Sequence, residues 1–273
     1  MNVCRNLSVL VIIFFSVAQF SFAQEITEEN YLKVDKEIWA EYEENMKDVI
    51  EYYKIHPDKG DSLMVIAEKF RSASNQKNII AAIKYASVPG GLDRLFILRV
   101  FIPKDTLRSV FKNLSEEMRN TPSGKRLLHH IESEQIEEGS RYYEIDAVDA
   151  KGRDFRLSSL KGKKILFLYG GLSCIGQEGR DYLNKIYNET SRDDFEIVTY
   201  CLSSNLDDLQ KVQQVHSCNF FLVSDFLEDD SPVYILYGAQ STPTCFFISQ
   251  EGIVEMKTIG LDKERINKLL KEN

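Results

Sequence analysis

The sequence predicts an all-α N-terminal region followed by a C-terminal α/β domain, and three observations support this division. Apolar residues recur at steps of three and four up to about residue 139, which is the period of a helix. From residue 140 onward, apolar runs of strand length alternate with amphipathic stretches of helix length, as in parallel β-α units. The 273 residues are enough for two regions, each with its own core.

In the first region we expect helices separated by turn-forming sequences. The apolar stripes lie over residues 39–53, 63–70, 79–83, 107–114 and 121–139. The sequence His-Pro-Asp-Lys-Gly-Asp at 56–61 ends the first stripe, and Val-Pro-Gly-Gly at 88–91 ends the third. Thr121 is the expected cap of the last helix, with Pro122 in its first turn and Gly139 at its end.

In the second region the expected strands and helices alternate. Strands are predicted within residues 142–157 (two short strands around Lys151-Gly152), 164–170, 195–203, 219–225, 244–249 and 253–260. Helices are predicted over residues 177–190, from 206 onward, over 231–238 and over 262–273. The last two strands form a hairpin, which predicts an antiparallel edge on a parallel sheet.

The first 23 residues have the pattern of a signal peptide. Arg5 precedes an apolar core over residues 7–18, and small residues at Ser21 and Ala23 suit a signal-peptidase site. The apolar stretch is short for a membrane span, although an uncleaved anchor is the alternative interpretation. We therefore expect a signal peptide (1–23), a helical region (24–139) and an α/β domain (140–273), exported and in contact with the membrane only through the signal segment.

Charge and cysteine content exclude some classes of function. The formal net charge of −8 and the pI near 5.2 are opposite to what a nucleic-acid-binding protein needs. Cleavage of the signal peptide would remove Cys4 and leave four cysteines: Cys174, Cys201, Cys218 and Cys245. Four cysteines allow three full pairings, among which the sequence does not choose, and a chain of this length does not need disulfides to fold.

The most informative short stretch is Gly-Gly-Leu-Ser-Cys at residues 170–174. Cys174 follows a predicted buried strand and precedes a predicted helix. The N-terminus of a helix stabilises a thiolate, the nucleophilic form of cysteine. Arg180 would add to this stabilisation if its side chain folds back toward the first turn. A redox protein would carry Cys-x-x-Cys here, but the position three residues after Cys174 is Gln177.

Two longer motifs around this turn resemble a known family. The sequence LSSLKGKKILFLY (157–169) and the sequence YGAQSTPTCFFISQEG (237–252) resemble those of TlpA/ResA-type proteins, exported bacterial thiol–disulfide proteins of the thioredoxin-like (AhpC/TSA–Redoxin) superfamily. The resemblance covers about residues 139–273. It implies a thioredoxin-like fold and a periplasmic location in the cell envelope.

The resemblance also implies residue roles, with departures from the family motif Trp-Cys-x-Pro-Cys-Arg-x-Glu. Cys174 matches the attacking thiol, but Ser173 replaces the tryptophan and Gln177 the second cysteine. Arg180 stands in place of the acidic residue, so the Cys-x-x-Cys motif is degenerate. Pro243 matches a cis-proline opposite the thiol, which would leave the backbone of Thr242 free to pair with an extended partner.

Three hypotheses about function follow. In the first, the chain is a thiol–disulfide oxidoreductase that acts through Cys174 alone, and a small thiol or a partner protein resolves the mixed disulfide. In the second, Cys201 is the resolving thiol, although a buried small hydrophobic residue is the favoured interpretation of Cys201. The alternative is a redox-inactive thioredoxin-fold module that binds a protein. The expected partners bear a thiol or a disulfide.

No cofactor or metal is expected. His129 and His130 lack the spacing of metal ligands on one helix face. His216 and Cys218 are only two ligands, too few for a zinc site. We therefore interpret Cys218 and its neighbouring histidine as incidental, and Cys245 as a core residue.

Overall fold

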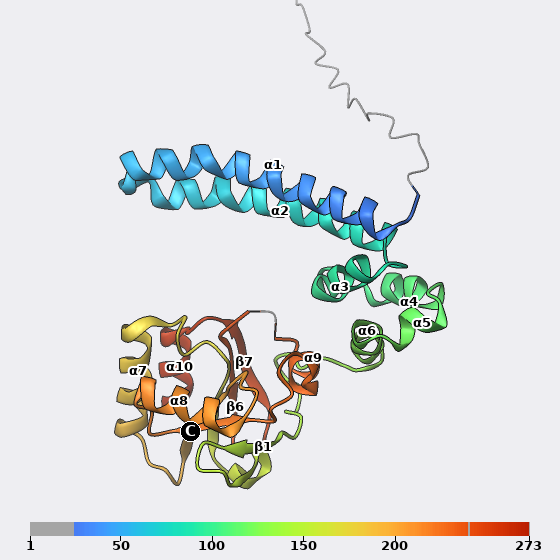
Figure 1. The fold of residues 1–273 in the computed structure, drawn as a ribbon. Helices are drawn as coiled ribbons and strands as arrows, with labels where there is room; N and C mark the ends of the chain where they lie inside the picture. The colour runs from blue at the N-terminus through green and yellow to red at the C-terminus, as the bar shows by residue number, and fades with distance from the viewer. Residues whose placement is uncertain (1–24, 240, 273) are drawn as a thin grey trace, which may run out of the picture.

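The computed structural model describes residues 25–239 and 241–272. Figure 1 shows the helical N-terminal region beside an α/β domain that holds the rest of the chain. The predicted signal peptide (1–23) lies outside the described residues. None of the helices in the described ranges is long and apolar enough to cross a membrane.

The helical region consists of a long hairpin and a group of shorter helices. Its α-helices are α1 (Glu28–Ile55), α2 (Gly60–Lys84), α3 (Pro89–Ile97), α4 (Lys104–Lys112), α5 (Glu116–Asn120) and α6 (Pro122–Glu132). Helices α1 and α2 run side by side in opposite directions, and α3 to α6 gather at one end of this hairpin (Figure 1). The predicted break at 56–61 is present, since α1 ends at Ile55 and α2 begins at Gly60.

Some predicted boundaries in this region were wrong. The stripes at 63–70 and 79–83 belong to one helix, α2. The residues between them, 71–78, are mostly polar but include no glycine or proline to break a helix. The sequence Val-Pro-Gly-Gly does more than end a helix, because Pro89 occupies the first turn of α3, a position that suits proline.

The start of α6 was predicted correctly and its end was not. The Thr121 hydroxyl caps the helix by accepting a hydrogen bond from the Gly124 N–H at 3.1 Å, with Pro122 in the first turn. The helix ends at Glu132, and Gly139 lies further on, in a turn with a φ of 89°. The glycine was the right kind of residue for a helix end, but it serves another turn.

The short helices share a buried core with one helix of the α/β domain. Leu92, Leu95, Leu107 and Leu127 are fully buried in it together with Ile235 of α9 (Pro232–Leu236). Apolar burial of this kind stabilises a fold by roughly 25 cal/mol per Å². The junction between the two regions is therefore packed through α9, which lies next to α6 in Figure 1.

The α/β domain is built on a mixed seven-stranded sheet. Its strands are β1 (Asp146–Asp149), β2 (Asp154–Arg156), β3 (Lys164–Tyr169), β4 (Phe195–Tyr200), β5 (Phe221–Ser224), β6 (Thr244–Ile248) and β7 (Val254–Ile259). The spatial order is β2-β1-β5-β4-β3-β6-β7. Strands β3, β4 and β5 are parallel, and β6 and β7 add the predicted antiparallel hairpin beside β3.

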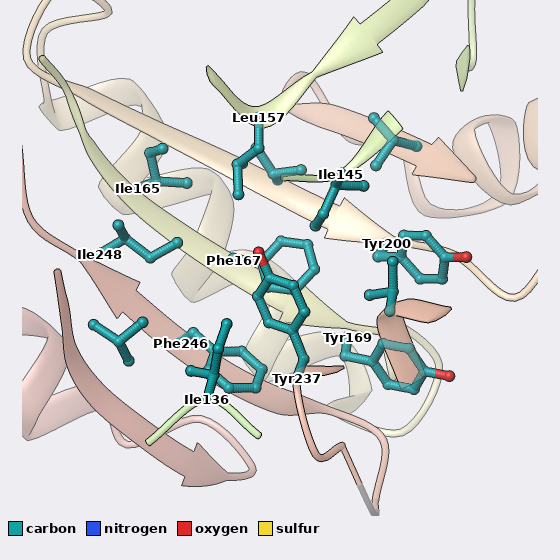
Figure 2. Packing of buried hydrophobic residues seen from close by; sticks show 14 of the residues in the cluster. Ile136, Ile145, Leu157, Ile165, Phe167, Tyr169, Tyr200, Tyr237, Phe246 and Ile248 are labelled. Carbon is teal, nitrogen blue, oxygen red and sulfur yellow. The ribbon is translucent and has the colours of Figure 1, made fainter. Parts of the chain in front are cut away.

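Helices cover both faces of this sheet. The remaining helices are α7 (Gly176–Glu189), α8 (Leu206–His216) and α10 (Lys263–Lys271). Side chains of these three helices pack on one face against Leu166 and Leu168 of β3. The alternate residues of β3 face the opposite core, which Figure 2 shows around Phe167, Phe246 and Tyr237. The predicted fold class is confirmed: an all-α region precedes a thioredoxin-like α/β domain.

Candidate active site

The candidate site lies where the end of β3 meets the start of β6. The two strands are antiparallel, and Tyr169 pairs with Thr244. This register places the residues after Tyr169 opposite Pro243. Gly171 has a φ of 83°, and a Cβ at this position would lie 2.3 Å from the Pro243 nitrogen. Only glycine fits a backbone approach this close at that φ.

The turn after β3 presents Cys174 beside Thr242. The Thr242–Pro243 peptide bond is cis. The Cys174 sulfur lies 3.8 Å from the Thr242 hydroxyl, and either group can be the donor. Both residues are exposed, whereas Pro243 is buried. The sequence-predicted nucleophile and groove residues thus meet at one edge of the sheet.

Backbone hydrogen bonds hold the cysteine in a turn just before α7. The Cys174 N–H donates to the Gly171 carbonyl at 2.9 Å, and the Ile175 N–H donates to the same oxygen at 3.1 Å. Helix α7 begins at Gly176, two residues after the sulfur-bearing residue. The positive end of the helix dipole therefore lies close to the thiol, where it favours a negative charge.

Arg180 folds back over this turn, as the sequence analysis required for it to influence the thiol. Its Nη1 donates to the Leu172 carbonyl at 3.0 Å, and its Nη2 donates to the Gln177 side-chain oxygen at 2.9 Å. The Gln177 amide in turn donates to Asp181 at 2.7 Å. Gln177, the residue in place of a second cysteine, is therefore held along the surface of α7.

A cavity of about 260 Å³ opens beside the thiol, and we call it the thiol cavity. Its lining includes Cys174, Cys201, Thr242 and His216. Burial raises the pKa of Cys201 to about 12, and the Cys201 thiol donates to the Thr199 carbonyl at 3.8 Å. The two cysteines thus share a cavity but differ sharply in exposure.

His216 is a site residue that the sequence analysis interpreted as incidental. It ends α8, and its Nε2 lies 3.3 Å from the Ser173 hydroxyl. Partial burial and the nearby Arg180 charge lower the pKa of His216, which favours the neutral imidazole. The available signal was topological, because α8 follows β4 and its end returns toward the β3 turn.

The other cysteines belong to the core on the α7 side of the sheet. All four cysteines in the described ranges are free thiols. Burial raises the pKa of Cys218 to about 11 and that of Cys245 to about 12, which makes both poor nucleophiles. Within the described residues, no group of three or more side chains could hold a metal ion.

Comparisons with known proteins find similarity to solved structures only. No protein-family profile and no curated protein matches the chain. The thioredoxin domain of a thiol-disulfide oxidoreductase from Bacteroides vulgatus is 22% identical, with a TM-score of 0.45, and the match covers 50% of this chain and 100% of that one. A thiol-disulfide oxidoreductase from Bacteroides fragilis is 16% identical, with a TM-score of 0.43, over 48% of this chain and 99% of that one.

Proposed function

We propose that this chain is an exported thiol–disulfide oxidoreductase that works through Cys174 as a single active-site thiol. The observation that carries the proposal is the placement of this exposed sulfur. It lies before the N-terminus of α7 and 3.8 Å from the hydroxyl of Thr242. This combination gives the thiol access to a partner and an electrostatic environment that favours the thiolate.

The reaction proceeds in two exchanges. The Cys174 thiolate attacks one sulfur of a substrate disulfide, a new S–S bond forms, and the second substrate sulfur leaves as a thiolate that takes up a proton. A small thiol then attacks the mixed disulfide and releases the first substrate sulfur. That exchange leaves the small thiol disulfide-bonded to Cys174, and a second molecule of the thiol attacks the small-thiol sulfur, forms the small-thiol disulfide and releases the Cys174 thiolate. In net terms, two external thiols are oxidised to a disulfide and the substrate disulfide is reduced to two thiols.

Resolution of the mixed disulfide by an external thiol is favoured because Cys201, the other thiol that lines the cavity, is buried. With a pKa raised to about 12 by burial, Cys201 has a thiolate fraction at pH 7 of about 10⁻⁵. It is also packed in the core among Leu209, Phe220 and their neighbours. Burial thus disfavours Cys201 as the resolving thiol, and we assign it a packing role.

Thr242 offers an extended partner a place to bind. Among the described residues, neither the N–H nor the carbonyl of Thr242 makes a backbone hydrogen bond. Exposed backbone groups of this kind can add a peptide segment by strand-like pairing. We therefore propose a protein or peptide that bears a thiol or disulfide as the partner class, with Thr242 and Pro243 forming one wall of its groove.

The remaining parts of the proposal concern organisation and location. We infer a signal peptide over residues 1–23, a helical region over 24–139 and the thioredoxin-like domain over 140–273. This arrangement supports export to the periplasm. Detection of the protein in a periplasmic extract, with its N-terminus at Gln24, would test both the location and the first boundary.

A redox-inactive binding module is the second candidate. The observation that favours it is the hydrogen-bonded set around Gln177, which joins Arg180 and Asp181 where a resolving cysteine would lie. In that case the groove beside Thr242 would bind a partner and the thiol of Cys174 would be a bystander.

One experiment separates the two candidates. The rate of alkylation of Cys174 is measured against pH, and reduction of hydroxyethyl disulfide is followed with added glutathione. Wild type is compared with Cys174→Ser, and Cys245→Ser is the matched control for loss of a thiol. Turnover that requires glutathione and disappears only in Cys174→Ser supports the monothiol oxidoreductase. Slow alkylation without turnover would establish the binding module instead.

A further inference from the structure

A second cavity, of about 780 Å³, lies at the junction of the helical region and the α/β domain, and we call it the junction cavity. Residues from both regions line it: Arg99 and His130 from the helical region, and Tyr234, Lys257 and Thr258 from the domain. Helices α6 and α9, which carry His130 and Tyr234, lie next to each other (Figure 1). This cavity shares no described lining residue with the thiol cavity and does not include Cys174.

Arg99 is the unusual feature of the junction cavity. Its side chain is fully buried, with 1% of the residue exposed, and it forms no ion pair with any described residue. Its Nη1 donates to the Phe96 carbonyl at 3.0 Å and to the Tyr234 hydroxyl at 3.3 Å. The Nε and Nη2 groups have no hydrogen-bond partner among the described residues. A buried charge left without a counter-charge is strongly destabilising.

Aromatic contacts do not satisfy these two groups. The guanidinium carbon lies 4.3 Å from the ring centroids of both Phe96 and Tyr234. Such contacts involve the faces of the guanidinium, whereas its N–H donors point outward within its plane. Nε and Nη2 are adjacent in that plane and form the fork that a carboxylate or phosphate accepts with two parallel hydrogen bonds.

Other side chains add to this preference for an anion. His130 is buried, and its Nδ1 also has no partner among the described residues. The described lining contains the cations Arg71, Arg99, Lys104 and Lys257 against one carboxylate, Glu137. That carboxylate is already paired with Lys257 at 3.0 Å. Arg71 is exposed and pairs with Glu68, which lies outside the lining, so the excess of positive charge comes from the buried Arg99 and from Lys104.

The mouth of the cavity is apolar. Ile97, Phe101 and Ile259 line it and are more than half exposed. Apolar side chains at an opening gain free energy when a ligand covers them. We propose that the junction cavity binds a small organic anion, with its carboxylate on the Nε–Nη2 edge of Arg99 and on His130, and its apolar body against the mouth.

Calorimetric titration of the full chain with hexanoate tests this proposal directly. Hexanamide has the same apolar body without the charge, and it should bind at least about tenfold more weakly, since a charge-assisted hydrogen bond contributes roughly 1.5–3 kcal/mol. Arg99→Met should weaken hexanoate binding by about 10- to 100-fold. Arg156→Met, the same change at an exposed arginine on β2, should leave it unchanged.

Equal binding of hexanoate and hexanamide would overturn the proposal and leave an apolar crevice with a structural arginine. Absence of binding by either compound would overturn it as well. Inorganic phosphate is the third probe: phosphate that binds more tightly than hexanoate would contradict the apolar body. None of these results depends on thiol turnover, so failure here is distinct from failure of the proposed function.

A measurement on the wild-type chain keeps the test valid if Arg99→Met does not fold. Burial and the neighbouring Arg99 and Lys104 charges lower the pKa of His130 to about 4. An anion beside His130 favours the imidazolium, so saturating hexanoate should raise the pKa measured by NMR. The His56 titration should not move. An unchanged His130 titration at saturating hexanoate would place the anion elsewhere and overturn the assigned site.

Discussion

The thiol cavity and the junction cavity use the same short segment in opposite ways. The segment that leads into β6 contributes Thr242 to the first cavity, and Ser241 and Thr244 to the second. In the thiol cavity the reactive group is exposed, and the structural constraint is in the backbone, where Gly171 packs on Pro243. In the junction cavity the polar groups of Arg99 and His130 are buried. The thiol cavity is therefore constrained by its backbone, whereas the junction cavity buries polar side chains.

The largest expected effect concerns the exposed thiol. At pH 7, Cys174 should react with iodoacetamide at least about 10³-fold faster than the buried cysteines, because burial raises the pKa of Cys201 to about 12 and leaves little thiolate. Mass spectrometry of the native protein should find the label on Cys174. In Cys174→Ser, labelling should require denaturant. Prompt labelling of Cys201 in the native state would contradict the contrast between the exposed Cys174 and the buried Cys201.

The second effect tests the backbone constraint of the thiol cavity. Gly171→Ala places a Cβ 2.3 Å from the Pro243 nitrogen, and neither backbone can yield without shifting β3 or β6. We expect the free energy of unfolding to fall by at least about 3 kcal/mol. Urea unfolding measures it.

Gly162→Ala is the matched control for this substitution. Gly162 has a φ of 88°, close to that of Gly171, but a Cβ there would meet no atom within 4 Å. It should cost only about 1 kcal/mol, the strain of a positive φ alone. Equal losses in the two variants would mean that the contact with Pro243 adds nothing.

The sequence was sufficient for what depends on local patterns. Each apolar run from β3 to β7 became a strand, because alternation and turn residues set these elements locally. Cys174, Thr242 and Pro243 were expected to meet because of the family resemblance, and they do lie together after β3 and before β6. Division of the stripe in α2 was wrong because apolar spacing does not show where a polar helix face continues.

The contacts that the sequence could not predict are the long-range ones between side chains. Arg99 and Tyr234 are 135 residues apart, yet they share a hydrogen bond and a ring contact at the junction. His216 and Ser173 are 43 residues apart. No periodicity in either segment encodes such pairs, since they arise from the way α8 and α9 pack on the rest of the fold.

A third effect tests the buried charge environment of the junction cavity. The pKa of His130 falls from 6.5 in the unfolded chain to about 4 in the folded protein. The unfolded state therefore binds more protons in this interval, and stability is full above pH 6.5 and is lost as the pH falls toward 4. The loss should reach up to about 3 kcal/mol.

Urea unfolding at several pH values measures this loss. His130→Gln should flatten the profile between pH 6.5 and pH 4, whereas His56→Gln, at an exposed position, should not. Hexanoate should reduce the loss if the anion binds beside His130. If His130→Gln leaves the slope of the wild-type profile unchanged in this interval, the His130 imidazole is not desolvated. The two cavities would then differ less than the structure indicates.

The smallest effect concerns Arg180 of α7, whose side chain folds back over the turn that carries Cys174. Arg180→Met removes its hydrogen bonds to the Leu172 carbonyl and to Gln177. It also removes one of the two causes that lower the pKa of His216, so that pKa should rise. Alkylation of Cys174 should slow by less than about fivefold, because the helix dipole remains. NMR titration and alkylation kinetics measure both quantities, with Arg156→Met as the control. If alkylation of Cys174 slowed a hundredfold, the side chain of Arg180, rather than the backbone of α7, would activate the thiol. The thiol cavity would then depend on a side-chain charge, as the junction cavity does.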